Sequence, residues 1–170
     1  MKVRSFFVLA LALMGASQLA LADAAKVGFL NAERVMRESA PAVRAQQRIE
    51  KEFSKRDQDL QRMAKDLESL QKDLDNENSK MSASERQAKE RSFRDLDREF
   101  RRKQQEFRED FNQRRNEEMN AIIEKVNQVI KQIAETEKYD LIFQEATYVN
   151  PRIDITDRVI KALASVSDAK

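Results

Sequence analysis

The chain has 170 residues, of which 36% are charged and 6% aromatic, and its mean hydropathy is −0.75. This balance favours long solvated helices over a single globular core. The sequence has no His and no Cys, which excludes imidazole and thiolate chemistry, disulfides, and nitrogen or sulfur metal ligands. We therefore predict a protein that is not an enzyme and needs no cofactor, although the many carboxylates leave an Asp or Glu pair formally open.

Residues 1–22 follow the three-part plan of a secretory signal peptide. Lys2 and Arg4 form the basic start, an apolar run follows, and Ala20 and Ala22 are small residues of the kind a signal peptidase requires. The apolar run is too short to span a bilayer as a mature helix. We predict cleavage after Ala22 and export to a bacterial periplasm, with a retained N-terminal anchor as the alternative.

Loss of this segment would leave the chain formally neutral, because Lys2 and Arg4 account for the net charge of +2. The remaining charge is unevenly distributed, since residues 85–115 carry +3 and residues 116–170 carry −3. A nucleic-acid-binding protein is expected to have a clear basic excess. We therefore expect no nucleic acid as a partner.

The first predicted elements are short. Residues 26–31 combine apolar and aromatic side chains in a strand-like run, and residues 32–39 predict a short helix. Pro41 suits the first turn of a further helix, with Ser39 or Ala40 near its cap.

That further helix is predicted to run to about Asp75, because its apolar residues follow heptad spacing. They are Ile49, Phe53, Leu60, Met63, Leu67, Leu70 and Leu74. Residues 76–80 then interrupt the pattern with turn-favouring types, and Ser82 and Glu85 have the spacing of a capping box. The chain is therefore predicted to turn back near residues 76–83.

The returning helix has a different apolar period. Its stripe comprises Phe93, Leu96, Phe100, Phe107, Phe111, Met119, Ile122, Val126, Ile130 and Ile133. Four of these, Phe100, Phe111, Ile122 and Ile133, recur every 11 residues, a period that favours a straight or slightly right-handed helix. Because the two helices differ in period, we expect loose packing between them.

After Lys138 the pattern changes to β-branched and aromatic residues. Residues 139–144 and 147–151 predict two strands, and Asp154 is placed to cap a last helix. The apolar residues of that helix are Val159, Ile160, Leu163 and Val166.

The predicted architecture is mainly α with a small β body. Residues 41–138 form an antiparallel helical hairpin arm, and residues 23–40 and 139–170 form the body. A body of about 50 residues buries too little apolar surface to be secure alone, and its strands expose edges. We therefore predict a homo-oligomer assembled through the body, at Val27, Phe29, Leu141, Ile142, Phe143 and Val149.

Four segments together carry a family resemblance. They are Lys-Val-Gly-Phe-Leu-Asn at 26–31, Arg-Arg-Asn-Glu-Glu at 114–118, Tyr-Asp-Leu-Ile at 139–142 and Asp-Ile-Thr-Asp at 154–157. In this order around a hairpin they resemble the Skp/OmpH family of periplasmic chaperones. The resemblance implies an ATP-independent holdase, a homotrimer with a central β-barrel, and hairpins around a cavity that holds unfolded outer-membrane proteins.

The resemblance also implies contacts to lipopolysaccharide or the membrane surface through basic residues of the returning helix. Lys103, Arg114 and Arg115 match these positions, whereas Gln113 stands where another basic residue is expected. The alternative for the basic side chains around Lys103 is a solvated face with intrahelical ion pairs.

Phe93, Phe100, Phe107 and Phe111 are the candidate contacts to an unfolded client, because apolar contacts without fixed hydrogen-bond requirements suit many partners. Packing within the hairpin seam is the alternative for each ring. A different class of function also remains open, that of a structural or adaptor protein of the cell envelope whose hairpin engages one defined helical partner.

Overall fold

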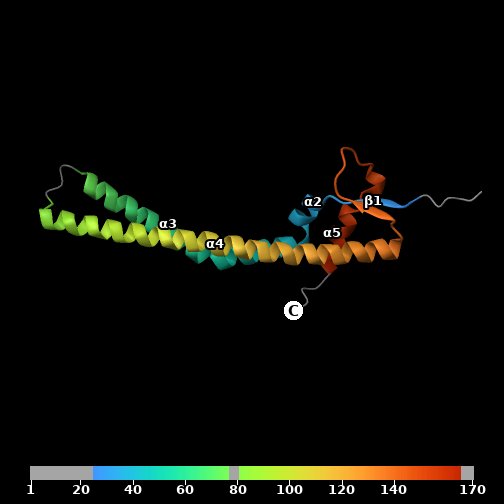
Figure 1. Ribbon diagram of the computed structural model, residues 1–170, viewed down its shortest axis with the longest axis horizontal. Coiled ribbons are helices and arrows are strands. Elements are labelled where there is room, and N and C mark those ends of the chain that lie inside the picture. The colour runs from blue at the N-terminus through green and yellow to red at the C-terminus, as the bar shows by residue number, and fades with distance from the viewer. Residues whose placement is uncertain (1–24, 77–80, 166–170) are drawn as a thin grey trace, which may run out of the picture.

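A computed structural model describes residues 25–76 and 81–165. The predicted signal peptide and Val166 lie outside the described residues. The described part is mainly helical with one small sheet, which confirms the predicted fold class at this level (Figure 1). Its elements are β1 (Val27–Phe29), α2 (Ala32–Glu38), α3 (Ala40–Asp75), α4 (Ala83–Glu137), β2 (Leu141–Phe143), the 3₁₀ helix η1 (Pro151–Ile153) and α5 (Thr156–Ser165).

The two long helices α3 and α4 lie side by side and run in opposite directions, with the small elements gathered at one end (Figure 1). The 55 residues of α4 extend over about 80 Å at 1.5 Å per residue. No helix within the described ranges is both long enough and apolar enough to cross a membrane. We call the end next to the sheet the root of the hairpin and the opposite end its tip.

The ends of the long helices follow their sequence signals. Pro41 lies in the first turn of α3, after Ser39 as the capping residue. Ser82 and Glu85 form the predicted capping box of α4, in which each side chain bonds the backbone of the other residue. At the far end of α4, Lys138 adopts the left-handed conformation with φ 57°, which glycine usually supplies.

The sheet has two parallel strands, with Val27 opposite Leu141 and Phe29 opposite Phe143. The other edge of β1 is occupied at Phe29, whose carbonyl accepts a 2.9 Å bond from the backbone N–H of Ile155. The predicted strand at 147–151 is wrong. Asn150 instead accepts a bond from the backbone N–H of Arg152, and Pro151 opens the turn η1, as expected of this turn-forming pair.

Gly28 allows the ring of Tyr139 to lie on the sheet. A Cβ atom at this position would come within 3.1 Å of that ring. The same ring is covered by the ammonium of Lys26, 4.2 Å from its centroid, and its hydroxyl accepts a bond from Arg158. Close packing therefore favours glycine at this position, although the backbone has an ordinary strand conformation.

One apolar core joins the root of the hairpin to the small elements. Its fully buried members are Leu30, Val35, Val159 and Leu163. The hairpin contributes Ala42, Ala45, Ile122, Val126 and Val129. Asp154 accepts a 2.8 Å bond from the first backbone N–H of α5, at Thr156, as predicted for the start of this helix. The root is thus fixed by the core, while the rest of the hairpin relies on contacts between α3 and α4.

We predict that Leu163→Ala lowers the free energy of unfolding by about 2–5 kcal/mol, because it leaves a cavity in a fully buried site. Leu67→Ala is the matched control, since Leu67 is only half-buried along the arm, and its loss should be clearly smaller. Denaturant unfolding followed by circular dichroism measures both. Equal losses would contradict the conclusion that the core at the root stabilises the fold more than the arm does.

Candidate functional site

The middle of the hairpin is held by three aromatic rings. Phe53 of α3, which is 5% exposed, packs edge-on against Phe107 and Phe111 of α4 at centroid distances of 5.5 and 5.3 Å. Arg56 lies over the rings of Phe53 and Phe107 and forms a 2.7 Å ion pair with Asp110. We call Phe53, Phe107 and Phe111 the aromatic cluster.

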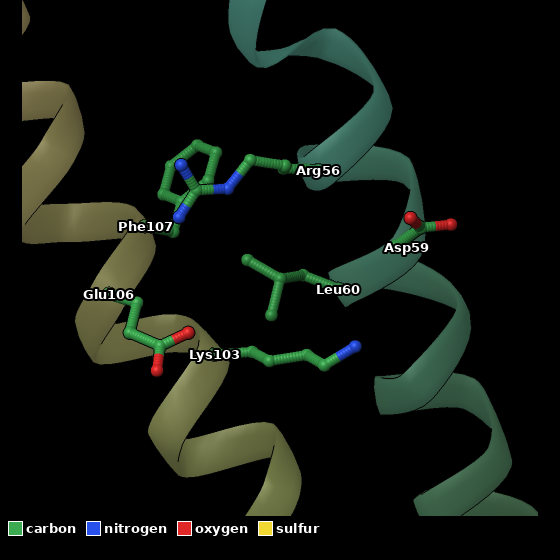
Figure 2. A pocket seen from close by; sticks show the side chains of 6 residues that line it. All are labelled: Arg56, Asp59, Leu60, Lys103, Glu106 and Phe107. Atoms are coloured by element: carbon green, nitrogen blue, oxygen red, sulfur yellow. The ribbon is translucent and has the colours of Figure 1, made fainter.

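An open pocket of about 340 Å³ follows on the tip side of this cluster. Leu60 points across from α3 toward α4, between the Arg56–Phe107 pair and the side chain of Lys103 (Figure 2). Asp59 and Glu106 complete its wall. Arg56 and Lys103 place long charged side chains where a tight coiled coil would have apolar ones, so the contact between the two helices stays open here. We call this opening the mid-arm pocket.

A second opening lies between the aromatic cluster and the root, and we call it the root groove. It has a volume of about 390 Å³. Ala42 and Ala45 of α3 are too small to fill the space opposite α4. The groove is lined by Met36, Ala42, Ala45, Gln46, Ile49, Glu50, Phe111, Arg115, Glu118, Met119 and Ile122.

A buried carboxylate links the two long helices beside the root groove. Glu118 of α4 is 6% exposed and accepts two bonds from the guanidinium of Arg48 on α3, at 3.0 and 2.6 Å. It also accepts a 2.6 Å bond from Arg114. Two cations thus compensate one buried anion, which is the condition under which burial of a charge is tolerated.

Arg114 extends this network to the surface. Its remaining donors reach Glu52 of α3 at 3.1 Å and Glu117 at 3.3 Å. Burial alone would lower the pKa of Arg114, but the bonds to Glu52 and Glu117 and the charge of Glu118 raise it above its ordinary value. Bonds from Gln113 and then Arg114 lower the pKa of Glu117. These groups therefore stay charged at neutral pH.

The structure separates the four candidate phenylalanines into two pairs. Phe107 and Phe111 belong to the aromatic cluster, so these two rings pack between the helices of the hairpin, which was the alternative to a client contact. Phe93 and Phe100 are half-buried, and neither has a ring partner within the described residues. The latter pair is therefore less committed to internal packing.

The basic residues suggested for lipid contact do not form one cluster. Lys103 lies at the mid-arm pocket and pairs with Glu99 at 3.3 Å. Arg114 belongs to the buried network, and Arg115 is exposed at the root groove. Intrahelical pairs also engage Arg94, Arg98, Arg101 and Arg102, which supports the solvated-face alternative for this stretch.

The large exposed apolar residues of the body lie in β2 and in the loop that follows it. Leu141 is 57% exposed and Tyr148 is 80% exposed. Val27, Phe29, Ile142, Phe143 and Val149, also assigned to oligomerisation, are half-buried. The rings of Phe29 and Phe143 pack edge-on at 5.6 Å across the two strands.

Sequence reasoning missed both Glu118 and the root groove. A signal for Glu118 was present, because it follows Phe111 by seven residues and precedes Ile122 by four, and thus occupies a seam position. The groove had a weaker signal, since Ala42 and Ala45 continue the stripe of Ile49 and Phe53 with small side chains.

A long antiparallel helical hairpin rooted in a small parallel sheet and short helices defines the structural class of this protein. The family model described as outer membrane protein (OmpH-like) matches residues 26–163. The chain therefore belongs to the OmpH-like family, which confirms the resemblance in its sequence.

A solved structure has the same fold. It is a Caulobacter crescentus protein described as a candidate outer membrane chaperone (OmpH-like), with a TM-score of 0.67 and 17% sequence identity. The alignment covers 83% of this chain and 85% of that chain. No curated protein sequence matches this chain.

We predict that Glu118→Gln lowers the free energy of unfolding by about 1–3 kcal/mol, because hydrogen bonds to charged groups are lost while Arg48 and Arg114 can partly rehydrate. Glu117→Gln is the matched control: the neighbouring residue is exposed, and the same change should cost less than about 0.5 kcal/mol. Urea unfolding measures both. If the two variants lose equal stability, the buried network does not hold the helices together.

Proposed function

We propose that this protein is an ATP-independent holdase chaperone of the bacterial periplasm, which binds unfolded outer-membrane proteins and prevents their aggregation. Membership of the OmpH-like family supports this proposal, as does the fold shared with a protein described as a candidate outer membrane chaperone. The observation that carries it is the open seam between α3 and α4. Leu60 and Phe107 are accessible among charged side chains in the mid-arm pocket, and the root groove has mostly apolar walls.

An open seam suits partners without a fixed structure. Unfolded chains present apolar side chains in many orders, and a surface that can repack accepts more of them than a rigid pocket does. Here Leu60, Phe107 and Phe111 border open spaces, while ion pairs along the outer faces keep the arm hydrated. Binding of this kind needs neither a catalytic residue nor a nucleotide.

The proposal includes a homotrimer in which the strands form a central barrel and three hairpins enclose the client. In this arrangement residues 23–40 and 139–170 are the oligomerisation body, and residues 41–138 are the arm. The support is the outer edge of β2, which pairs with no other strand within residues 25–76 and 81–165, and the exposure of Leu141 in this strand. Such an edge is a ready template for pairing with another chain.

Lipopolysaccharide at Lys103, Arg114 and Arg115 stays a prediction from the family resemblance. A lipid phosphate would have to displace Glu99 from Lys103 and carboxylates from Arg114. We propose no nucleic-acid partner.

Light scattering tests the function directly. When a urea-unfolded outer-membrane β-barrel protein is diluted into buffer without ATP, a molar excess of the purified protein should suppress the rise in scattering. The physical reason is that the open seam competes with client self-association for the same apolar side chains. Unchanged aggregation at molar excess would contradict the proposal.

Two matched variants assign that activity to the arm. Phe100→Ala should weaken suppression with little change in stability, because Phe100 lies outside the aromatic cluster. Phe107→Ala removes a cluster ring and should also lower the free energy of unfolding by about 2–4 kcal/mol. If Phe100→Ala retains full suppression, this ring is not a client contact.

Sedimentation tests the assembly. At micromolar concentration the purified protein should sediment as a trimer, and Leu141→Lys should shift it toward monomer by placing a charge on the β2 edge. Asp140→Lys, at the neighbouring position, would remove the bond that Asp140 accepts from the backbone N–H of Lys26. Lys161→Glu, at an exposed position of α5, is therefore the better control for a change of charge. A folded monomer of the unmodified protein would contradict the trimer.

A further inference from the structure

The root groove combines apolar walls with one available cation. We propose that it docks a segment of unfolded polypeptide in which an apolar side chain stands close to a carboxylate. The apolar side chain enters between α3 and α4, and Arg115 binds the carboxylate. This inference rests on the proposed function and names a site and a client preference within it.

The groove has the size and lining of a side-chain binding site. Its volume of about 390 Å³ falls within the range of about 300–1,000 Å³ typical of ligand pockets. Ala42 and Ala45 form a buried floor, and Met36 and Met119 are half-buried at its walls. Methionine side chains are flexible and polarizable, so they adapt to apolar groups of different shape.

Exposed apolar residues continue the groove along both helices. Val43 of α3 and Ile123 of α4 are each 43% exposed. Val43 precedes Gln46 by one helical turn, and Ile123 follows Met119 by one turn, so each shares a face with a residue that lines the groove. An extended segment would therefore find apolar contact beyond the groove itself.

Arg115 is the cation whose charge is available at this site. Arg48 and Arg114 are both engaged by Glu118. Within the described residues, Arg115 has no ion pair or hydrogen bond through its side chain. Beside Arg115, an anionic group is therefore favoured over a cationic one.

The α3 rim favours a polypeptide over a lipid. Gln46 donates to Glu50 at 3.1 Å, and both residues line the groove opposite Arg115. Glu50 can accept from the backbone N–H groups of an extended peptide, which a lipid does not provide.

The experiment uses two short, unstructured, fluorescently labelled peptides that differ only in Glu or Lys beside each Phe. Fluorescence anisotropy with the purified full chain at low salt should show about 3- to 10-fold tighter binding of the Glu peptide, the range expected of one partly exposed ion pair. Arg115→Glu should reverse this preference. Arg108→Glu is the control, because Arg108 is exposed on the same helix and does not line the groove, and it should leave the preference unreversed.

A second variant tests the apolar part. Ala45→Leu places a larger side chain on the floor of the groove and should weaken both peptides by about 10-fold, in line with about 1.4 kcal/mol of lost contact. Its helical circular dichroism and unfolding midpoint establish that it is folded. If it is folded and binds both peptides as tightly as the unmodified protein, the groove is not the docking site.

Competition and scattering separate the remaining outcomes. In the competition experiment, phosphatidylglycerol vesicles are added to the complex with the Glu peptide. If the vesicles displace this peptide, and Arg115→Glu does not reverse the peptide preference, the site binds lipid and the proposal is overturned. If the unmodified protein suppresses aggregation while Arg115→Glu keeps the Glu preference, the groove assignment fails and the proposed function stands. If the unmodified protein does not suppress aggregation, the proposed function itself fails.

Discussion

The bonds from Arg48 and Arg114 to the buried carboxylate of Glu118 fix how α3 and α4 meet. A buried anion must keep its cations, because desolvation without them is costly. The helices therefore cannot slide past each other without breaking the two bonds from Arg48 to Glu118 and the bond from Arg114 to Glu52. The network lies beside the root groove and shares Arg114 with the surface pair to Glu52. It holds the hairpin in register while small and charged residues leave the seam open around it.

Stability and binding are divided between the two ends of the chain. Apolar burial at Leu30, Val35, Val159 and Leu163 closes the root. Along the arm Phe53 is buried, but most other apolar positions toward the tip are only half-buried. Incomplete packing lowers stability, but it leaves apolar surface that another chain can bury. The segment beyond residue 22 is formally neutral. This agrees with client binding that depends on local contacts, including single charges such as Arg115, more than on total charge.

Much of the fold could be predicted because periodicity and capping are local properties of the sequence. Heptad spacing predicted α3, and the capping-box spacing of Ser82 and Glu85 predicted the start of α4. The strand predicted at 147–151 failed because Asn150 and Pro151 form a turn, and their local bonds prevailed over the β propensity of Tyr148 and Val149. The left-handed conformation of Lys138 was not predicted, because glycine usually supplies it. The pairing of Glu118 with Arg48 is a contact between residues 70 positions apart, which no local pattern reports.

The central claim is that the open seam of the hairpin holds unfolded polypeptide. Hydrogen–deuterium exchange of the purified protein, with and without an unfolded outer-membrane β-barrel protein, tests it most directly. Added client should slow exchange in the segments around the root groove and the mid-arm pocket, residues 42–60 and 100–123, and leave α5 unchanged. Suppressed aggregation with protection confined to the β2 edge or α5, and none along these segments of the hairpin, would contradict the account.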